Sequence, residues 1–549
     1  MGMGKALCLF VCLGAVFSQP PTKPNIVVVM LDDVGYNDVG WNNPHIKTPN
    51  LDKMAREGVT LNNSYSQPVC SPSRAALLTG RYPHNVNMDG AATFGPTIPD
   101  GLDLKYWILP QKLKELGYTT HAIGKWHLGF CDWKYTPTER GFDTFFGFYL
   151  GANDYFTHRT TIGKDGFDGL DLRFNKTLVT DKDGVYDTNM WSDRAVEIIK
   201  NHDKNAPFFV YVAYNGIHGP LRAPQDAIAK YPKISNGNRR TVGAMMSVID
   251  EGVANITKAL TDSGIMDNTF FLFLSDNGGQ YGSGNNYPLR GAKSTFFEGG
   301  MRTPAFVSGG LLKKKGYTHN GLFHIADWTP TILSLAGGDV TGENLDGIDM
   351  TKTVLEGANS SRDEIIHFLS QRNLPDSPPV RQQGVIRQGD WKLIEGHVGH
   401  DLDDWYQDPF DLEGQAGATR WRRGLGGKNK DKLNKTPKVP KVRTTRAPKP
   451  AKVTKVPGTT VDKVRPSGSR EYVTYLFNIK DDPYERTDLS AQYPELVQRL
   501  QNRLRELHKT YPNLKKYQES ELSNPDNWGG AWSPGWCTAE NSVTEPVIG

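Results

Sequence analysis

Four short apolar runs of this chain each lead into polar side chains that could perform chemistry. The runs are rich in β-branched and aromatic residues and cover residues 25–31, 119–123, 207–214 and 269–275. The polar side chains that follow them are Asp32 and Asp33, Lys125 and His127, His218, and Asp276 and Asn277. Continuous apolar runs of this length are typical of strands that are buried on both faces of a parallel sheet. We therefore expect these side chains at the carboxyl ends of parallel strands.

Amphipathic patterns between these runs predict the helices that cover the sheet. Apolar residues recur at spacings of three and four over residues 51–57, 109–116, 192–201 and 241–263. Alternation of strands and helices favours a doubly wound α/β fold. In such sheets ligands bind beyond the carboxyl ends of the strands. The acids, amide, lysine and histidines named above therefore mark the predicted ligand site.

The pattern changes after about residue 375. Residues 384–394 and 472–478 are typical of antiparallel strands, and residues 491–508 predict a long amphipathic helix. We interpret residues 23–375 as the catalytic α/β domain and residues 376–549 as a smaller C-terminal α+β domain. Residues 419–466, which we call the basic insert, repeat Lys-Pro, Lys-Val and Thr, and we expect them to be extended and disordered because they cannot bury a core.

The net charge is concentrated in the basic insert. The chain has 549 residues and a net charge of +4, yet residues 420–465 carry 16 Lys and Arg against two acids. The rest of the chain is therefore acidic, at about −10. A nucleic-acid enzyme usually spreads basic residues over its folded surface. We therefore expect no nucleic-acid partner, and a polyanion as the possible partner of residues 420–465.

The amino terminus predicts entry into the secretory pathway. Lys5 precedes twelve mostly apolar residues at 6–17, and small residues stand before Gln19, so residues 1–18 resemble a signal peptide. The stretch is too short to span a membrane, and no other stretch reaches about 18 apolar residues. Five Asn-x-Ser/Thr sequons follow and give weak support for a glycoprotein. Removal of the signal leaves three cysteines, Cys70, Cys131 and Cys537, so one thiol has no partner.

One segment carries a resemblance to a known family. Residues 70–74 read Cys-Ser-Pro-Ser-Arg and residues 78–81 read Leu-Thr-Gly-Arg. This pair resembles the Cys-x-Pro-x-Arg signature of the type I sulfatases and the motif that follows it. The resemblance implies an alkaline-phosphatase-like doubly wound mixed sheet, sulfuric ester hydrolase activity, and oxidation of Cys70 to 3-oxoalanine (Cα-formylglycine) by the formylglycine-generating enzyme. Such oxidation would also explain why one of the three cysteines has no disulfide partner, because residue 70 would no longer be a thiol.

The chemistry of sulfate ester hydrolysis explains why an aldehyde would be needed at residue 70. A hydrated aldehyde has two hydroxyls, so that one can attack sulfur and the other can expel sulfate afterwards, whereas a serine could perform only the first half. Pro72 suits the first turn of a helix that continues to about Thr79. Residue 70 then lies near a helix N-terminus, which favours an anion.

The resemblance also assigns roles to the residues at the strand ends. It implies one Ca²⁺, held by oxygen ligands of the kind that hard cations prefer. The implied metal ligands are Asp32, Asp33, residue 70, Asp276 and Asn277. The implied catalytic set is Cys70, Arg74, Lys125, His127, His218 and Lys293, in which the lysines bind sulfate oxygens, His127 contacts the formylglycine hydroxyl, His218 serves the leaving alcohol, and Arg74 holds the formylglycine and metal shell.

The similarity extends from residue 25 to about residue 478 and resumes weakly to residue 536. It is greatest with the arylsulfatase B group, which includes N-acetylgalactosamine-4-sulfatase and the arylsulfatases I and J, in segments such as 124–129, 140–147 and 527–536. Three features depart from that group. Only Cys131 and Cys537 could pair, the basic insert is foreign to the pattern, and Arg222 stands where relatives often have Gln. The resemblance to this group therefore does not predict that this chain shares its 4-sulfate specificity.

Two alternatives compete with a sulfatase. A related phosphatase would share the sheet but would use Ser or Thr and two metals. A secreted, catalytically silent matrix protein would bind polyanions through the basic insert, although no site residue of the family is missing here. The expected substrate is a sulfated carbohydrate or an aryl sulfate. Secretion is the preferred location, with the lysosome as the alternative.

Overall fold

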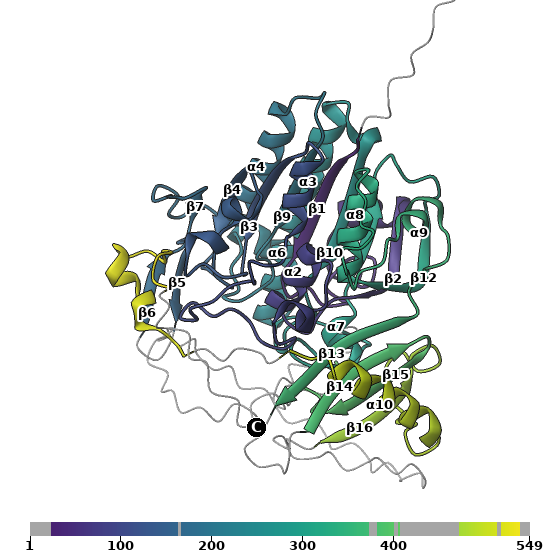
Figure 1. Cartoon of the computed structure of the whole chain (residues 1–549). Coiled ribbons are helices and arrows are strands. Elements are labelled where there is room, and N and C mark those ends of the chain that lie inside the picture. Colours follow the sequence, from purple (N-terminus) through teal and green to yellow (C-terminus); the bar gives the residue numbers. More distant parts are fainter. Residues whose placement is uncertain are drawn as a thin grey trace, which may run out of the picture.

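The computed structural model describes residues 23–162, 166–372, 381–399, 404–406, 472–512 and 518–537. The predicted signal peptide and the basic insert lie outside these residues. The described chain forms a ten-stranded sheet covered by helices and a separate four-stranded sheet (Figure 1). Among the described residues, none of the helices combines the length and the apolar character needed to cross a bilayer.

The large sheet has the strand order β12-β2-β11-β10-β1-β9-β3-β4-β7-β8. Its strands are β1 (Asn25–Leu31), β2 (Val59–Tyr65), β3 (Thr119–Lys125), β4 (Thr144–Phe148), β7 (Arg173–Phe174), β8 (Thr177–Leu178), β9 (Phe208–Ala213), β10 (Thr269–Ser275), β11 (Ala305–Ser308) and β12 (Tyr317–His324). The four predicted strands are the adjacent strands β10, β1, β9 and β3, and all of their pairings are parallel. Their carboxyl ends therefore meet at one edge of the sheet, as the sequence predicts.

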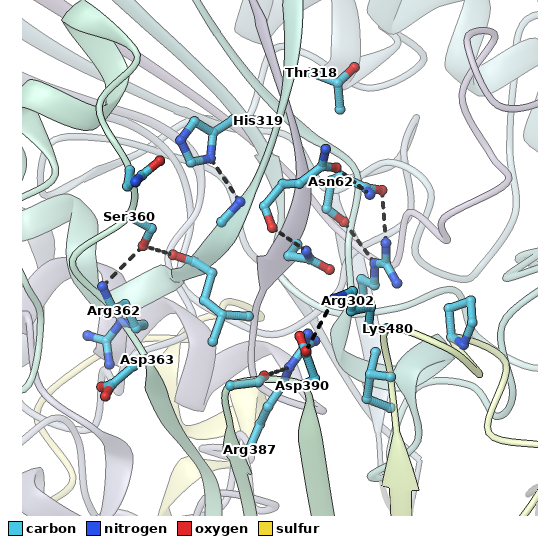
Figure 2. A pocket seen from close by; sticks show the side chains of 18 of the residues that line it. Asn62, Arg302, Thr318, His319, Ser360, Arg362, Asp363, Arg387, Asp390 and Lys480 are labelled. Carbon is cyan, nitrogen blue, oxygen red and sulfur yellow. Dashed lines mark hydrogen bonds and ion pairs between the residues drawn. The ribbon is translucent and has the colours of Figure 1, made fainter.

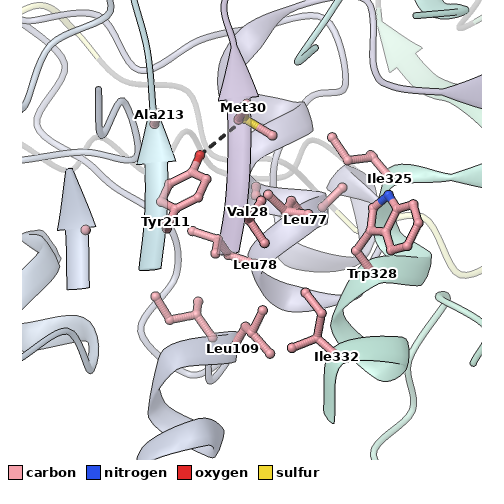
Figure 3. Packing of buried hydrophobic residues seen from close by; sticks show 14 of the residues in the cluster. Val28, Met30, Leu77, Leu78, Leu109, Tyr211, Ala213, Ile325, Trp328 and Ile332 are labelled. Carbon is pink, nitrogen blue, oxygen red and sulfur yellow. Dashed lines mark hydrogen bonds between the residues drawn. The ribbon is translucent and has the colours of Figure 1, made fainter. Parts of the chain in front are cut away.

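Helices cover both faces of this sheet, which confirms the doubly wound arrangement. Alternate residues of β1 point to opposite sides, and each side has its own core. Figure 3 shows Val28 and Met30 of β1 beside Leu77 of α2, with Leu109 of α3 and Ile332 of α8 packed in the same layer. The helices on this face are α2 (Cys70–Thr79), α3 (Leu109–Glu115) and α8 (Trp328–Leu335), and those on the other are α1 (Pro49–Glu57), α4 (Asp187–Asn201) and α6 (Gly237–Asp262).

The four-stranded sheet is antiparallel and carries one long helix, α10 (Pro494–His508). Its strands are β13 (Glu364–Arg372), β14 (Arg381–Gln388), β15 (Trp391–Gly396) and β16 (Val473–Asn478). The predicted antiparallel segment 384–394 is divided by a turn at Gly389 and Asp390 between β14 and β15. The sheet begins with β13, before residue 376, where the sequence places the start of the C-terminal domain. The basic insert lies between β15 and β16.

Shorter elements complete the described chain. They are the hairpin β5 (Arg159–Ile162) and β6 (Phe167–Leu170), and the helices α5 (Gln225–Ala229), α7 (Glu298–Met301) and α9 (Thr351–Glu356). A disulfide joins Cys131 to Cys537 across 406 residues of sequence and anchors the carboxyl-terminal segment. Trp532 and Trp536 of that segment are buried in the core of the large sheet.

A buried charge cluster joins the two sheets. Lys392 of β15 places its Nζ 2.9 Å from Oε1 of Glu298 in α7 and 2.8 Å from Oε1 of Glu485. The backbone N–H of Glu298 donates to Oε2 of Glu485 at 2.6 Å, and the Tyr65 hydroxyl donates to Oε2 of Glu298 at 2.6 Å. All three charged side chains are fully buried. Because Lys293 precedes Glu298 by a few residues, this cluster anchors the loop that carries Lys293.

Candidate functional site

The strand ends bring together side chains that are far apart in the sequence. Asp32 follows β1, Lys125 ends β3, and Asp276 follows β10. Lys125 Nζ lies 2.5 Å from Asp32 Oδ2, and the backbone N–H of Asp33 donates to Asp276 Oδ1 at 3.2 Å. These contacts arise because β10, β1, β9 and β3 are neighbours, so their ends open on a common space.

Cys70 enters this space from the first residue of α2. Its Sγ lies 3.6 Å from Asp32 Oδ1, and the residue is buried. The helix is buried along its whole length, which fixes the position of its amino terminus. Burial raises the pKa of the Cys70 thiol to about 12, although Lys125 and Lys293 oppose this shift. A cysteine that acts as a thiolate nucleophile normally has a lowered pKa, so this thiol does not have that character.

Three buried carboxylates face three buried or nearly buried cations. Besides the pair of Lys125 with Asp32, Lys293 Nζ lies 2.6 Å from Asp33 Oδ1, and Arg74 Nη2 donates to Asp276 Oδ2 at 2.7 Å. The three pairs are balanced in charge. A bound divalent cation would therefore give the site an excess positive charge, which suits a substrate that is itself an anion.

The same residues fit a hard metal ion. Asp32, Asp33, Cys70 and His218 each offer one ligand atom, and these atoms lie within 4.8 Å of one another. Asp33 Oδ2 and Asn277 Oδ1 are buried, and neither has a hydrogen-bond partner among the described residues. Buried carboxylate and amide oxygens without donors are costly unless something else satisfies them. Oxygen ligands of this kind are those that Ca²⁺ and Mg²⁺ prefer.

Burial and neighbouring charges shift the pKa values of Asp33 and Asp276 in opposite directions. Burial alone would raise the pKa of Asp33, but the charge of Lys293 and hydrogen bonds from Lys293 and Asn277 hold it below its usual value. Burial, together with the negative charge of Asp32, raises the pKa of Asp276 to about 6. Asp33 is therefore better stabilised as a carboxylate than Asp276.

Two histidines reach the site in a neutral form. Burial and the charge of Lys125 lower the pKa of His127 well below its usual value, and its Nδ1 has no hydrogen-bond partner among the described residues. Burial and the charge of Lys293 lower the pKa of His218 to about 4, and its Nε2 lies 3.9 Å from Asp33 Oδ2. A neutral imidazole can accept a proton or hold one in a hydrogen bond. Both can therefore take part in proton transfer.

Backbone conformation and close packing hold these side chains in place. Asp33, His127 and Ser294 have φ values of 62°, 56° and 70°, in the left-handed region that residues with side chains rarely adopt. Such conformations cluster at functional sites. Gly151 lies directly beside the ring of His127, and a Cβ at this position would come within 2.5 Å of Cε1. The loop that follows β4 therefore packs against this imidazole.

All of the site residues predicted from the sequence converge here. The sequence analysis did not identify Tyr211 of β9, whose hydroxyl accepts a hydrogen bond from Arg74 Nη1 at 3.4 Å. Its only sequence signal is a hydroxyl within an otherwise apolar run, which is no different from that of an ordinary core tyrosine. It also did not predict the cluster of Glu298, Lys392 and Glu485, because these residues are far apart in sequence.

A large cavity of about 920 Å³ lies elsewhere, between the edge of the large sheet and the four-stranded sheet. Figure 2 shows polar side chains in its lining, among them Asn62, Arg302 and Arg362. Its three buried arginines already have partners, because Arg302 donates to Asn62, Arg362 pairs with Asp327, and Arg387 pairs with Glu298. None of the residues of the strand-end site lines this cavity, so it is separate from the predicted chemistry.

Comparison with known proteins identifies the family. A family model described as Sulfatase matches residues 24–338. Arylsulfatase J of Mus musculus is 39% identical over 533 residues, which cover 95% of this chain and 81% of that protein. N-acetylgalactosamine-6-sulfatase of Homo sapiens is 34% identical over 358 residues, which cover 62% of this chain and 67% of that protein.

A solved structure gives the same result for the fold. The crystal structure of Ps i-CgsB in complex with k-i-k-neocarrahexaose is similar with a TM-score of 0.66 at 26% identity, over 92% of this chain and 96% of that chain. The expected fold, an alkaline-phosphatase-like mixed sheet with a smaller antiparallel sheet, is confirmed. With the family model and arylsulfatase J matching most of the region that forms the strand-end site, this chain belongs to the sulfatase family.

Proposed function

We propose that this chain hydrolyses sulfate esters by means of a formylglycine at position 70 and one bound Ca²⁺. The observation that carries the proposal is the position of Cys70, at the amino terminus of a buried helix and among three cations. A sulfate monoester is an anion, and helix N-termini and lysines are groups that bind anions. A raised thiol pKa supports a nucleophile other than the thiolate.

Residue 70 would supply the nucleophile. The aldehyde hydrate offers one hydroxyl to attack sulfur and a second whose deprotonation lets sulfate leave. His127 would orient the hydroxyls of residue 70 or accept a proton from them. Arg74, which pairs with Asp276, would hold this residue and the neighbouring carboxylates in position.

The remaining residues would bind the sulfate group, the metal and the leaving alcohol. Lys125 and Lys293 would bind sulfate oxygens, and His218 would give a proton or a hydrogen bond to the departing alcohol oxygen. Asp32, Asp33, Asp276, Asn277 and residue 70 would hold the metal, which would neutralise charge on the sulfate. The buried oxygens of Asp33 and Asn277 that lack donors support this ligand set.

We infer a sulfated carbohydrate or an aryl sulfate as substrate. The names of N-acetylgalactosamine-6-sulfatase and of the sugar complex of Ps i-CgsB support the first, and the name arylsulfatase J supports the second. The arylsulfatase B type and its 4-sulfate specificity stay predictions. The comparisons give no support to a phosphatase or to a catalytically silent matrix protein.

The sequence supports a secretory protein that meets the formylglycine-generating enzyme during its synthesis. Secretion, with the lysosome as the alternative, rests on the predicted signal at residues 1–18. The domain boundaries at residues 375 and 376 likewise stay predictions.

Mass spectrometry of the peptide that contains residue 70 tests the proposal. Protein purified from cells that contain the formylglycine-generating enzyme should carry the aldehyde or its hydrate at this position. The same protein should hydrolyse 4-nitrocatechol sulfate and leave 4-nitrophenyl phosphate nearly unchanged. An unmodified thiol in protein that turns over the sulfate ester would contradict the formylglycine, and turnover of the phosphate alone would contradict the sulfatase.

A further inference from the structure

The strand-end site opens to solvent on one side. The side chains of His218 and Lys293 are 22% and 13% exposed, whereas those of Asp32, Lys125, Arg74 and Asp276 are fully buried. A substrate whose sulfate group reaches Cys70 must therefore extend past His218 and Lys293. The part of the substrate that leaves as the alcohol lies on this side, and residues around the opening contact it.

Arg222 lies on the same loop as His218, four residues further along the chain. The loop is held at both ends, because the Tyr155 hydroxyl donates to the backbone O of His218 at 2.8 Å and the Tyr186 hydroxyl donates to the backbone O of Arg222 at 3.0 Å. The side chain of Arg222 is nevertheless 58% exposed. Its backbone is therefore fixed while its charged end faces solvent.

Asp154 orients this exposed guanidinium. Arg222 Nε lies 3.0 Å from Asp154 Oδ2, while Asp154 Oδ1 accepts the backbone N–H groups of Phe156 and Thr157 at 3.1 and 3.0 Å. The side chain of Asp154 is only 16% exposed. The carboxylate is therefore withdrawn from the surface, and the pair presents its positive end to solvent.

The loop that carries Asp154 also packs against the site. Asn153 Oδ1 accepts a hydrogen bond from Asn215 Nδ2 at 3.0 Å, and Gly151 lies directly beside the His127 ring. The ion pair of Arg222 with Asp154 thus joins the loop after β9 to the loop after β4. These strands flank β3, which ends at Lys125, so both loops lie at the same end of the sheet as the site.

Besides Asp154, the guanidinium of Arg222 has no hydrogen-bond or ion-pair partner among the described residues. The Arg222 side chain is 58% exposed, and a planar guanidinium can offer its N–H groups to a carboxylate or a sulfate in a bidentate contact. An ordinary surface ion pair would contribute little to stability. The fixed backbone, the withdrawn acid and the position on the loop that carries His218 together favour a binding role.

We infer that Arg222 is a specificity-determining residue that binds a second anionic group, a carboxylate or a sulfate, on the saccharide that carries the reacting sulfate ester. This inference rests on the proposed function. It assigns the substrate to a polyanionic class of saccharide sulfates, because a neutral alcohol has no group for Arg222 to bind. A small aryl sulfate would reach Cys70 without this contact.

The test compares ligands with and without a second anion in the parent, Arg222→Gln and Arg222→Lys. The ligands are inorganic sulfate, N-acetylgalactosamine monosulfate, a disulfated N-acetylgalactosamine, and a monosulfated chondroitin disaccharide with a uronate. Their inhibition constants are measured against turnover of 4-nitrocatechol sulfate. Arg222→Gln should weaken the ligands with a second anion about tenfold, as expected for loss of one charge-assisted contact. Arg222→Lys should weaken them less.

The controls separate a binding role from a structural one. Arg503→Gln removes a comparable half-exposed arginine of α10, which pairs with Glu364 of β13, and should change no inhibition constant. In Arg222→Gln, kcat/KM for 4-nitrocatechol sulfate and the inhibition by inorganic sulfate should stay within about twofold of the parent. An effect on the uronate disaccharide alone assigns a carboxylate, an effect on the disulfated sugar alone assigns a sulfate, and an effect on both assigns either anion.

Two results would overturn the inference. One is equal weakening of all ligands, including inorganic sulfate, and the other is no weakening of any ligand with a second anion. Calorimetric titration of the same ligands gives the comparison without turnover. A parent protein that binds them but hydrolyses no sulfate ester would contradict the proposed function and leave the role of Arg222 to be judged by binding.

Discussion

Residue 70 combines a reactive side chain with an environment that suppresses its ordinary reactivity. The Cys70 thiol is buried at the start of α2, its pKa is raised to about 12, and it lies beside the carboxylate of Asp32. Neither burial nor a neighbouring negative charge activates a thiol. The same surroundings suit an aldehyde hydrate, because lysines and a helix N-terminus stabilise the negative charge that develops on oxygen.

Replacement of Cys70 tests this interpretation. Cys70→Ala should reduce turnover of 4-nitrocatechol sulfate by at least about a thousandfold, because it removes the nucleophile. Cys70→Ser should not restore turnover, since a single hydroxyl cannot expel sulfate, although one sulfated intermediate could accumulate and be detected by mass spectrometry. Thermal unfolding of both variants should stay close to that of the parent. Activity of Cys70→Ala within tenfold of the parent would refute the mechanism.

The metal ligands give a second prediction at this scale. Ca²⁺ at about 100 times its dissociation constant should stabilise the protein by about 2.7 kcal/mol, so chelation should lower the midpoint of thermal unfolding. Asp33→Asn should respond much less to chelation and should lose metal in elemental analysis, because it removes a carboxylate from the predicted ligand set. Asp390→Asn, at an exposed position, is the matched control. Equal responses of Asp33→Asn and the parent would exclude Asp33 as a ligand.

At the scale of elements, the loop after β10 depends on the four-stranded sheet. The bridge between Thr295 and Gly399 and the hydrogen bond from Phe296 N to Val398 O attach this loop to the segment after β15. Lys392 then pairs with both Glu298 and Glu485 beneath it. The position of Lys293 is therefore decided by both sheets, although Lys293 precedes the strands of the second one in sequence.

Lys392→Met tests this coupling. Removal of the ammonium takes away the cation shared by Glu298 and Glu485 and leaves Glu298 with the more distant Arg302 and Arg387, at 3.7 and 4.0 Å. Loss of one partner from a buried ion pair typically costs about 3–5 kcal/mol. Denaturant unfolding should show this loss, and kcat/KM for 4-nitrocatechol sulfate should fall in protein that is still folded. Lys480→Met, which removes an exposed lysine 3.9 Å from Asp390 in the same region, should cost less than about 1 kcal/mol. Comparable losses in the two variants would show that the buried cluster has no special role.

At the scale of the whole molecule, the charge is divided between an acidic body and the basic insert. Residues 420–465 carry 16 Lys and Arg against two acids, and prolines recur through them. A solvated segment of this charge binds polyanions by counterion release, so its binding falls steeply as salt rises. In an enzyme that acts on sulfated glycans, such a segment would raise the local concentration of substrate.

Deletion of residues 420–465 tests this role. The deletion variant should lose retention on heparin at low salt, whereas the parent should be retained and should elute as salt approaches physiological concentrations. Turnover of 4-nitrocatechol sulfate should be the same in both, because the small substrate needs no tether. Equal retention of the two proteins would mean that the insert is a spacer.

The sequence alone determined much of the fold and the membership of the candidate site. Buried strands such as Asn25–Leu31 are recognisable because both of their faces must be apolar, and the residue types that follow them are visible in the printed chain. The motif at Cys70 is local, so its spacing could be recognised directly. For the same reason α2 could be predicted from Pro72 and the residues after it.

Only the tertiary structure decided which of these residues touch and how they are charged. The pairing of Lys293 with Asp33, the unsatisfied oxygen of Asn277 and the raised thiol pKa of Cys70 depend on strand order and burial, which local sequence does not encode. The ion pair of Arg222 with Asp154 likewise could not be predicted from the sequence, because it joins the loops after two strands that are far apart in the chain. Electrostatic interactions depend on distance in space and on exposure to water, and both are set by the packed sheet.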